Sequence, residues 1–87
     1  KEDPVAAYES AVADFAKALE LHPGLHEAWT RRGWVRIHWG NWCAGQGQDS
    51  VAHFRAARDD LRESLKLNPA QPAVRQWLDS IEAALGR

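Results

Sequence analysis

Apolar residues recur every three or four positions along most of the chain, which is the spacing of one face of an α-helix. The first such stripe follows Asp3 and Pro4, a pair that is typical of a helix N-terminus. Its members are Val5, Tyr8, Val12, Phe15 and Leu19. The run His22-Pro23-Gly24 marks the end of this first predicted helix.

Further helices are predicted along the rest of the chain. The second covers about residues 25–39 and the third about residues 50–67, where Pro69 stops it. Pro72 opens a fourth helix and Gly86 ends it. The apolar faces of the last two carry Val51, Phe54, Leu61 and Leu65, and then Val74, Leu78, Ile81 and Leu85. No segment alternates with a period of two, so the expected fold is all-α with about four helices.

Two segments of the chain resemble each other, which indicates an internal repeat. FAKALELHPGLHEAW (residues 15–29) and LRESLKLNPAQPAVR (residues 61–75) align when Pro23 is placed on Pro69. Repetition of a helix–turn–helix unit is the mark of a solenoid, in which each unit buries its apolar face against its neighbours.

The repeat resembles the tetratricopeptide repeat family. The small–large–small–proline pattern of that family's second helix matches Ala11, Phe15, Ala18 and Pro23, and then Ala57, Leu61, Ser64 and Pro69. The tryptophan and glycine of the family's first helix match Trp29 and Gly33. The resemblance implies an antiparallel array: the second helix of one repeat, one complete repeat, and a lone helix after it. It also implies a core role for Trp29 between paired helices.

Two arginines depart from the family pattern. Arg32 stands where the family usually has leucine, and Arg36 stands where it usually has tyrosine. We expect both side chains to lay their aliphatic stems over apolar surface and to keep their guanidinium heads in water.

The repeat is longer than that of the family. Pro23 and Pro69 are 69 − 23 = 46 residues apart, whereas a tetratricopeptide repeat takes about 34 residues. The resemblance holds up to Gly40, the turn glycine between paired helices, and resumes at Phe54, at the start of the third helix. The insertion is therefore predicted to be an exposed inter-helix loop over residues 41–53.

The ends of that predicted loop carry signals of their own. Trp42 and Cys43 could prolong the second helix by about a turn, and Asp49 or Ser50 is expected to cap the third. Trp39 and Trp42 should pack on the start of the third helix, near its first apolar residues. The alternative, in which Trp42 takes the family's aromatic position and a longer helix follows it, is disfavoured. Twelve extra residues would rotate the apolar face by about 120°, and Gly45 and Gly47 would each cost about 1 kcal/mol in a helix.

Composition changes this picture mainly by exclusion. A chain of 87 residues is a single domain by length, here residues 1–87. The net charge of −1, with both signs mixed, gives no basic stripe for nucleic acid, and no apolar run approaches the roughly 18 residues of a membrane span. One cysteine excludes an intrachain disulfide, which is compatible with a cytoplasmic location. Because the chain lacks methionine, we expect it to be a fragment of a longer protein.

Candidate chemistry is sparse. Cys43 with His38 and His53 could form a metal site, but zinc ligands usually come as closely spaced pairs and none is present. A cysteine–histidine pair could serve a thiol enzyme, but a glycine-rich turn is a poor platform for the geometry that such a pair needs. We expect no catalysis, no metal and no cofactor, and we keep an enzyme centred on Cys43 as a third hypothesis.

One helix face suggests binding. On the second helix Trp34 groups with Thr30, Ile37 and His38, and the resemblance implies that this face lines a concave groove. Tryptophan is prominent among interface hot spots, so the leading hypothesis is a protein–protein interaction module that binds a peptide or helix of a protein partner. The predicted partner-binding residues are Glu27, Thr30, Trp34, Ile37, His38 and Gln76.

The alternative is structural. The chain would be an oligomerisation segment of a longer helical solenoid, with Trp34 in its interior. Its lengthened turn is similar to that of repeats in bacterial serine/threonine-kinase-type signalling proteins, which would place the segment in signalling. The stripe that contains Tyr8 and Phe15 lacks the helix that would precede it in a full repeat, so a homo-oligomer is expected. Trp77, beside Leu78, is expected to pack in the core.

Overall fold

The computed structural model describes residues 3–86, and within them it contains four α-helices and no strand. The helices are α1 (Val5–Leu21), α2 (His26–Gly45), α3 (Val51–Leu67) and α4 (Pro72–Ala84). The all-α class predicted from the apolar spacing is therefore confirmed. Short connections keep helices that are neighbours in sequence next to each other in space.

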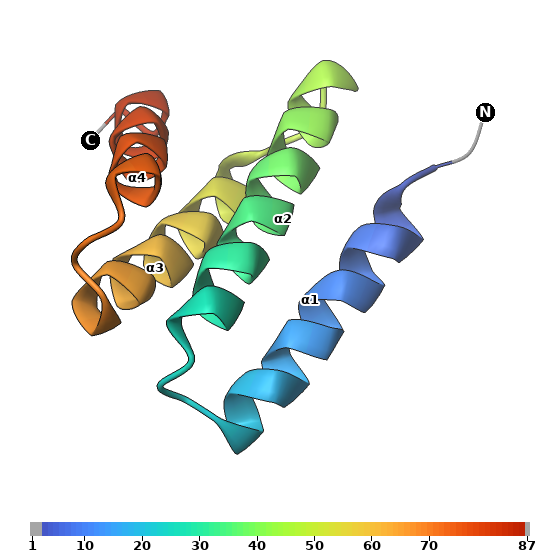
Figure 1. Ribbon diagram of the computed structural model, residues 1–87. Coiled ribbons are helices and arrows are strands. Elements are labelled where there is room, and N and C mark those ends of the chain that lie inside the picture. Colours follow the sequence, from blue (N-terminus) through green and yellow to red (C-terminus); the bar gives the residue numbers. More distant parts are fainter. Residues whose placement is uncertain (1–2, 87) are drawn as a thin grey trace.

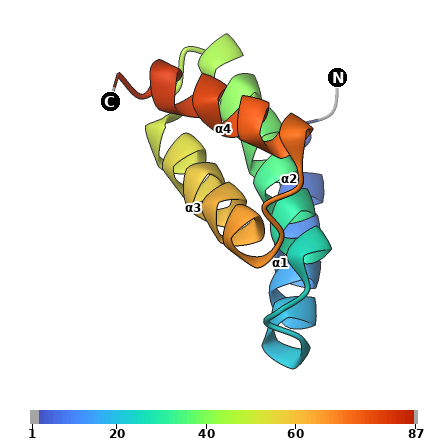
Figure 2. The same ribbon diagram turned by 60° about the vertical axis from the view of Figure 1, so that its left-hand side comes forward.

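The first three helices lie side by side and alternate in direction (Figure 1). α2 lies between α1 and α3 and packs most extensively on α3. α4 packs on α3 and runs across the α2–α3 pair (Figure 2). α1 and α4 are thus the outer helices, on opposite sides of the array.

The core lies between α3 and α4. Its buried members are Ala57, Leu61, Leu65, Val74, Leu78 and Ile81, with Ile37, Phe54, Trp77 and Leu85 packed partly buried against them. These residues include the predicted apolar stripes of both helices, with one exception. Val51 is 39% exposed, because it is the first residue of α3 and lies beyond the packed turns.

α1 is less well covered than the other helices. Asp3 Oδ1 accepts a hydrogen bond from the Val5 N–H at 2.8 Å, as expected of a residue at a helix start. Of the predicted apolar stripe only Leu19 is buried, and the other members are partly exposed. The reason is that α1 makes extensive contact only with α2.

α2 includes the extra turn that Trp42 and Cys43 were expected to add, and α3 begins close to the predicted residue 50, so the inserted loop is shorter than the predicted 41–53. Residues 41–45 continue α2 and residues 51–53 begin α3, which leaves residues 46–50 as the connection. The extra turn of α2 buries Cys43, which is 5% exposed, and this burial favours helix over loop.

Gly47, two residues past the end of α2, stops the helix, a role that was predicted for Gly40. Its φ of 72° is left-handed, a conformation that glycine adopts without steric cost. The Gly47 N–H donates to the Ala44 carbonyl at 3.1 Å, and the Gln48 N–H donates to the Cys43 carbonyl at 2.8 Å. This pair of bonds is a Schellman motif, which satisfies carbonyls that the end of a helix leaves free.

The start of α3 is capped by Asp49. Its Oδ1 accepts a hydrogen bond from the Val51 N–H at 3.0 Å, whereas Ser50 makes no side-chain cap bond. Of the two predicted capping residues, the structure thus selects the first.

Aromatic side chains connect the first turns of α1 and α3 with the C-terminal part of α2. The Trp39 ring stacks on His53 of α3, with ring centroids 4.3 Å apart, and on Tyr8 of α1 at 5.8 Å. Gly40 lies next to Trp39 inside α2, and a Cβ there would come within 2.8 Å of the Phe54 ring. The residue predicted as a turn glycine is therefore a close-packing glycine of the α2–α3 interface.

Trp29 lies at the start of α2, where the chain leaves the α1–α2 turn. Its indole Nε1 donates a hydrogen bond to the Pro23 carbonyl at 2.9 Å, and the Arg32 guanidinium lies 5.1 Å above its ring. Trp29 is partly buried and lies outside the α3–α4 core, and its hydrogen bond to Pro23 stabilises the α1–α2 turn.

Arg32 and Arg36 are bound to a buried carboxylate, so the prediction that their heads stay in water is wrong. Asp60 of α3 is 2% exposed and accepts two hydrogen bonds from Arg32, at 3.0 and 2.8 Å. Arg36 donates a third, at 2.8 Å, and the two arginine side chains are only 14% and 22% exposed. Gly33 lies between them and permits close approach, because a Cβ there would meet Leu61 Cδ2 at 2.9 Å.

Candidate functional site

A groove open to solvent lies between α2 and α4. It has a volume of about 310 Å³ and is lined by Thr30, Arg31 and Trp34 of α2 and by Trp77 of α4. Trp34 is 48% exposed, whereas Trp77 is partly buried and packs against the α3–α4 core. Concave surfaces lined by aromatic side chains with a few polar groups are the usual form of a binding site. This α2–α4 groove is the candidate functional site.

Three of the predicted partner-binding residues lie at the groove or beside it. Thr30 and Trp34 line it directly. His38 lies one turn farther along α2, with its ring centroid 4.0 Å from a Trp34 ring centroid, and it is exposed. The ring of His38 therefore extends the aromatic ridge of Trp34 along the helix.

The other three predicted residues lie outside the lining. Ile37 turns inward and packs, partly buried, against the α3–α4 core. Glu27 is exposed in the first turn of α2, with its Oε2 3.5 Å from Nε2 of His26. Gln76 is exposed on α4, next to Trp77 in sequence.

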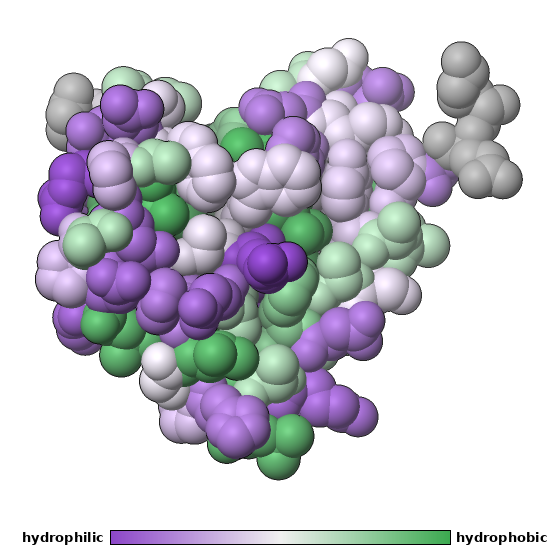
Figure 3. Space-filling model, viewed as in Figure 1, coloured by the Kyte–Doolittle hydropathy of each residue, from purple (hydrophilic) through white to green (hydrophobic). Residues whose placement is uncertain are grey.

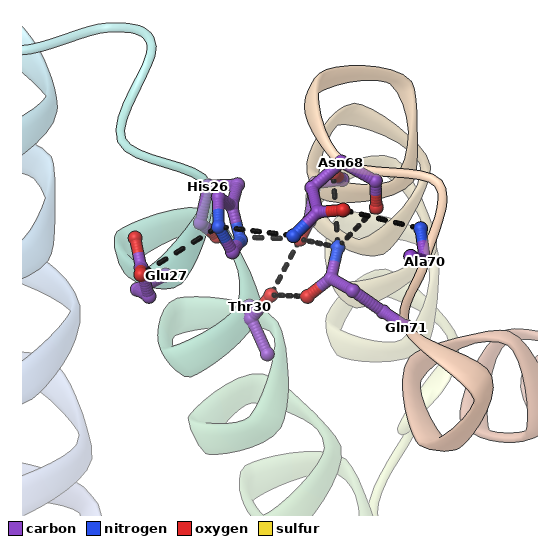
Figure 4. Close-up of polar contacts among 7 residues, drawn as sticks. His26, Glu27, Thr30, Asn68, Ala70 and Gln71 are labelled. Atoms are coloured by element: carbon purple, nitrogen blue, oxygen red, sulfur yellow. Dashed lines mark hydrogen bonds and ion pairs between the residues drawn. The ribbon is translucent and has the colours of Figure 1, made fainter.

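The Thr30 side chain is engaged inside the protein. Its hydroxyl is hydrogen-bonded to the Ser64 hydroxyl of α3 and lies 3.3 Å from Oε1 of Gln71, the residue just before α4 (Figure 4). A hydroxyl carries one proton, so Thr30 donates to only one of these two oxygens. Thr30 therefore links α2 to α3 and to the start of α4, and its hydroxyl is less available to a ligand than that of a free surface threonine.

Gln71 and Asn68 extend this network over the end of α3. The Gln71 amide nitrogen lies 3.1 Å from the Ser64 carbonyl and 2.7 Å from the Asn68 carbonyl, and donates to both. The Asn68 amide lies 3.2 Å from Nε2 of His26, at the start of α2 (Figure 4). The Ser64 carbonyl also accepts the Asn68 N–H at 2.9 Å, whereas the Asn68 carbonyl, beyond the last turn of α3, receives its hydrogen bond from the Gln71 side chain. The network fixes the start of α4 relative to α2 and α3.

Two lining residues, Arg31 and Trp77, were missed as site residues. Arg31 lies three positions before Trp34, so both project from one side of α2, and this spacing could have identified it. Trp77 was assigned to the core alone. It follows the apolar stripe of α4 on one flank, where a large ring can pack inward with one part and face the groove with another.

A larger hollow, of about 530 Å³, lies at the α1–α2 turn. It is lined by residues 21–25, in which Leu21 is 73% exposed and Leu25 is 41% exposed. In the space-filling view apolar and polar side chains lie side by side at this end of the molecule (Figure 3). All its lining residues come from one continuous segment, so it lacks the convergence of polar groups from separate elements that orients a ligand.

Cys43, His38 and His53, the residues proposed for a metal or thiol site, each make separate packing contacts. Cys43 is buried, whereas a reactive thiolate needs access to its substrate. The rings of His38 and His53 stack on Trp34 and Trp39 respectively. Within residues 3–86, no group of three or more histidine, cysteine, aspartate or glutamate side chains is placed to hold a metal ion.

Comparisons of the chain with models of known protein families, with curated proteins and with solved structures found no match. Over residues 3–86, no helix is both long enough and apolar enough to cross a bilayer.

Proposed function

We propose that this chain is a protein–protein interaction module that binds a peptide segment of its partner in the α2–α4 groove. The observation that carries the proposal is the indole of Trp34, 48% exposed at a groove whose opposite wall is Trp77. A partner side chain placed between the two rings would remove apolar surface from water at about 25 cal/mol per Å². Aromatic anchors of this kind supply much of the binding free energy of small interfaces.

The size of the groove favours an extended peptide over a whole helix face. Ligand clefts generally span about 300–1,000 Å³, and the volume of about 310 Å³ is at the lower end of that range. Such a volume suits one or two inserted side chains, whereas a docked helix offers a row of anchors at successive turns.

The order of the helices supports the tetratricopeptide-type interpretation. In that interpretation α2 and α4 are first helices of successive repeats, α3 is the second helix of the complete repeat, and first helices line the concave face. The groove lies between α2 and α4, as this interpretation requires. The lengthened α2 and the short connection at residues 46–50 are departures from the regular repeat.

A random peptide display library tests the proposal. Wild-type protein should enrich a consensus peptide, and Trp34→Ala should abolish the enrichment. The matched control is Leu21→Ala, which truncates another exposed apolar side chain but in the hollow of the α1–α2 turn. Equal enrichment by wild type and Trp34→Ala would reject the groove, and loss in Leu21→Ala alone would transfer the site to the α1–α2 turn.

A second candidate function is structural, as an oligomerisation segment of a longer helical solenoid. It is favoured by α1, whose apolar stripe has only one fully buried member. A helix of an adjoining repeat or of a second copy could cover the partly exposed Tyr8 and Phe15. Sedimentation over a range of protein concentrations tests this function: a rise in mass that Tyr8→Lys prevents supports it, and a constant monomer mass contradicts it.

A further inference from the structure

The charge of the α2–α4 groove comes from a single side chain. Three arginines lie close together on α2, and two of them, Arg32 and Arg36, are bound to Asp60. The third, Arg31, is exposed and lines the groove. None of the ion pairs formed within residues 3–86 includes Arg31. Its guanidinium therefore faces the groove without a carboxylate partner from that part of the chain.

Glu27 is the acidic residue that could have neutralised Arg31, since the two are four positions apart on α2. The structure instead places the Glu27 carboxylate 3.5 Å from His26 and gives it no ion pair with Arg31. Glu27 also lies outside the residues that line the groove. The Glu27 carboxylate lies one turn nearer the start of α2 than Arg31. An acidic ligand group is therefore attracted at Arg31 and repelled near Glu27.

The α4 wall of the groove contributes no charge. Ala73 and Ser80 lie four positions before and three positions after Trp77, so they share its side of the helix. Glu82 is five positions from Trp77, about 140° around the helix, and it accepts a hydrogen bond from Arg62 of α3 at 2.7 Å. The acidic group of that flank therefore faces α3 and is already paired.

We propose that the occupant of the groove is an acidic peptide in which a large apolar side chain lies next to an aspartate or glutamate. The inference rests on the proposed function and adds the chemistry of the partner. The apolar side chain lies between the rings of Trp34 and Trp77, and the neighbouring carboxylate binds the Arg31 guanidinium, which suits bidentate contact. A lysine or arginine at the same peptide position is repelled, so the groove discriminates against basic segments.

The experiment starts from the consensus peptide that wild-type protein enriches in the display library. This peptide and a version with its acidic residues changed to the matching amides are titrated by fluorescence anisotropy against three proteins. These are the wild type, Arg31→Gln, and the control Arg75→Gln. Arg31 is exposed and without an ion pair within residues 3–86, so Arg31→Gln is expected to fold normally. Arg75 lies about 160° away from Trp77 on α4, so its substitution removes the same charge away from the groove.

For wild type and Arg75→Gln, the acid-to-amide change should weaken binding about tenfold, which corresponds to about 1.4 kcal/mol. For Arg31→Gln the two peptides should bind alike. A consensus that depends on Trp34 but lacks acidic residues would overturn the acidic inference and leave the proposed function standing. Acid dependence that persists in Arg31→Gln also overturns it, and the absence of any Trp34-dependent consensus overturns both.

Discussion

Asp60→Ala should be among the most destabilising single substitutions in this protein. The carboxylate is 2% exposed and accepts three hydrogen bonds from Arg32 and Arg36. Its removal leaves two positive heads, 14% and 22% exposed, close together and without their counter-ion. Breaking a buried ion pair by removing one partner typically costs about 3–5 kcal/mol, because the remaining charge stays buried.

That loss is large relative to the total stability. A chain of this length has a free energy of unfolding of about 4–13 kcal/mol, taking about 0.05–0.15 kcal/mol per residue. Arg36→Ala should cost less, about 1.5 kcal/mol, because Asp60 keeps both hydrogen bonds from Arg32 and loses only one. Asp60→Ala should therefore lose more stability than Arg36→Ala, because it leaves two buried guanidinium groups unpaired, whereas Arg36→Ala leaves Asp60 paired with Arg32.

Urea denaturation followed by circular dichroism and tryptophan fluorescence measures these losses. With an m-value of about 1–1.5 kcal/mol per M, Asp60→Ala should lower the midpoint by about 2–5 M. The matched control is Asp59→Ala, whose carboxylate is 67% exposed and pairs with Arg58 at 3.3 Å. An exposed pair of this kind contributes at most about 1 kcal/mol. Equal losses for Asp59→Ala and Asp60→Ala would refute the reasoning.

A triple substitution separates the cost of unpaired charge from the cost of lost packing. Replacing Arg32, Arg36 and Asp60 together by leucine removes every charge of the cluster while keeping much of its volume. Apolar replacement of a complete buried ion cluster is often neutral or stabilising, so this variant should be more stable than Asp60→Ala. If it is less stable, packing and not charge accounts for the loss.

Three further predictions use the same urea titration. Gly33→Ala should lower the free energy of unfolding by about 1–3 kcal/mol, because the new Cβ would meet Leu61 at 2.9 Å. Gly45→Ala should raise the free energy of unfolding by about 0.5–1 kcal/mol, because the space around Gly45 is open. Effects of the same sign for the two variants would contradict the packing described for Gly33. Leu61→Ala should cost about 3–5 kcal/mol and partly exposed Phe15→Ala clearly less, and the reverse order would show that α1 is better buried than described. Gly47→Ala should cost about 1–2 kcal/mol through its left-handed φ, and a neutral result would mean that α2 ends elsewhere.

The helices and their buried faces could be predicted because each depends on residues close in sequence. Of the stripe predicted for the fourth helix, Val74, Leu78 and Ile81 are buried, and Leu85, one residue past the end of α4, is partly buried. The fate of residues 41–53 could not be predicted in the same way. Whether these residues form helix or loop depends on the burial of Cys43 and on the packing of the Phe54 ring against Gly40, and both involve contacts between helices.

The ion cluster shows a signal that sequence reasoning overlooked. Asp59 and Asp60 are adjacent and identical in type, so local propensity does not distinguish them. Asp60 lies three positions after Ala57 and four before Ser64, next to Leu61, and this face is buried. A carboxylate on a buried face requires cationic partners, and Arg32 and Arg36 were available on the preceding helix.

The candidate site, like the fold, could be predicted from the sequence only in part. Trp34 was predicted because spacing groups it with Thr30 and His38 and the family resemblance implies that this face lines a groove, while Trp77 required knowledge of how α4 crosses the α2–α3 pair. The polar contacts beneath the groove explain why these two rings should stay in register. Thr30, Ser64 and Gln71 join α2, α3 and the start of α4 through partly buried hydrogen bonds. A peptide bound as proposed would therefore meet walls that are already positioned, and its binding would cost less conformational entropy than binding to a mobile surface.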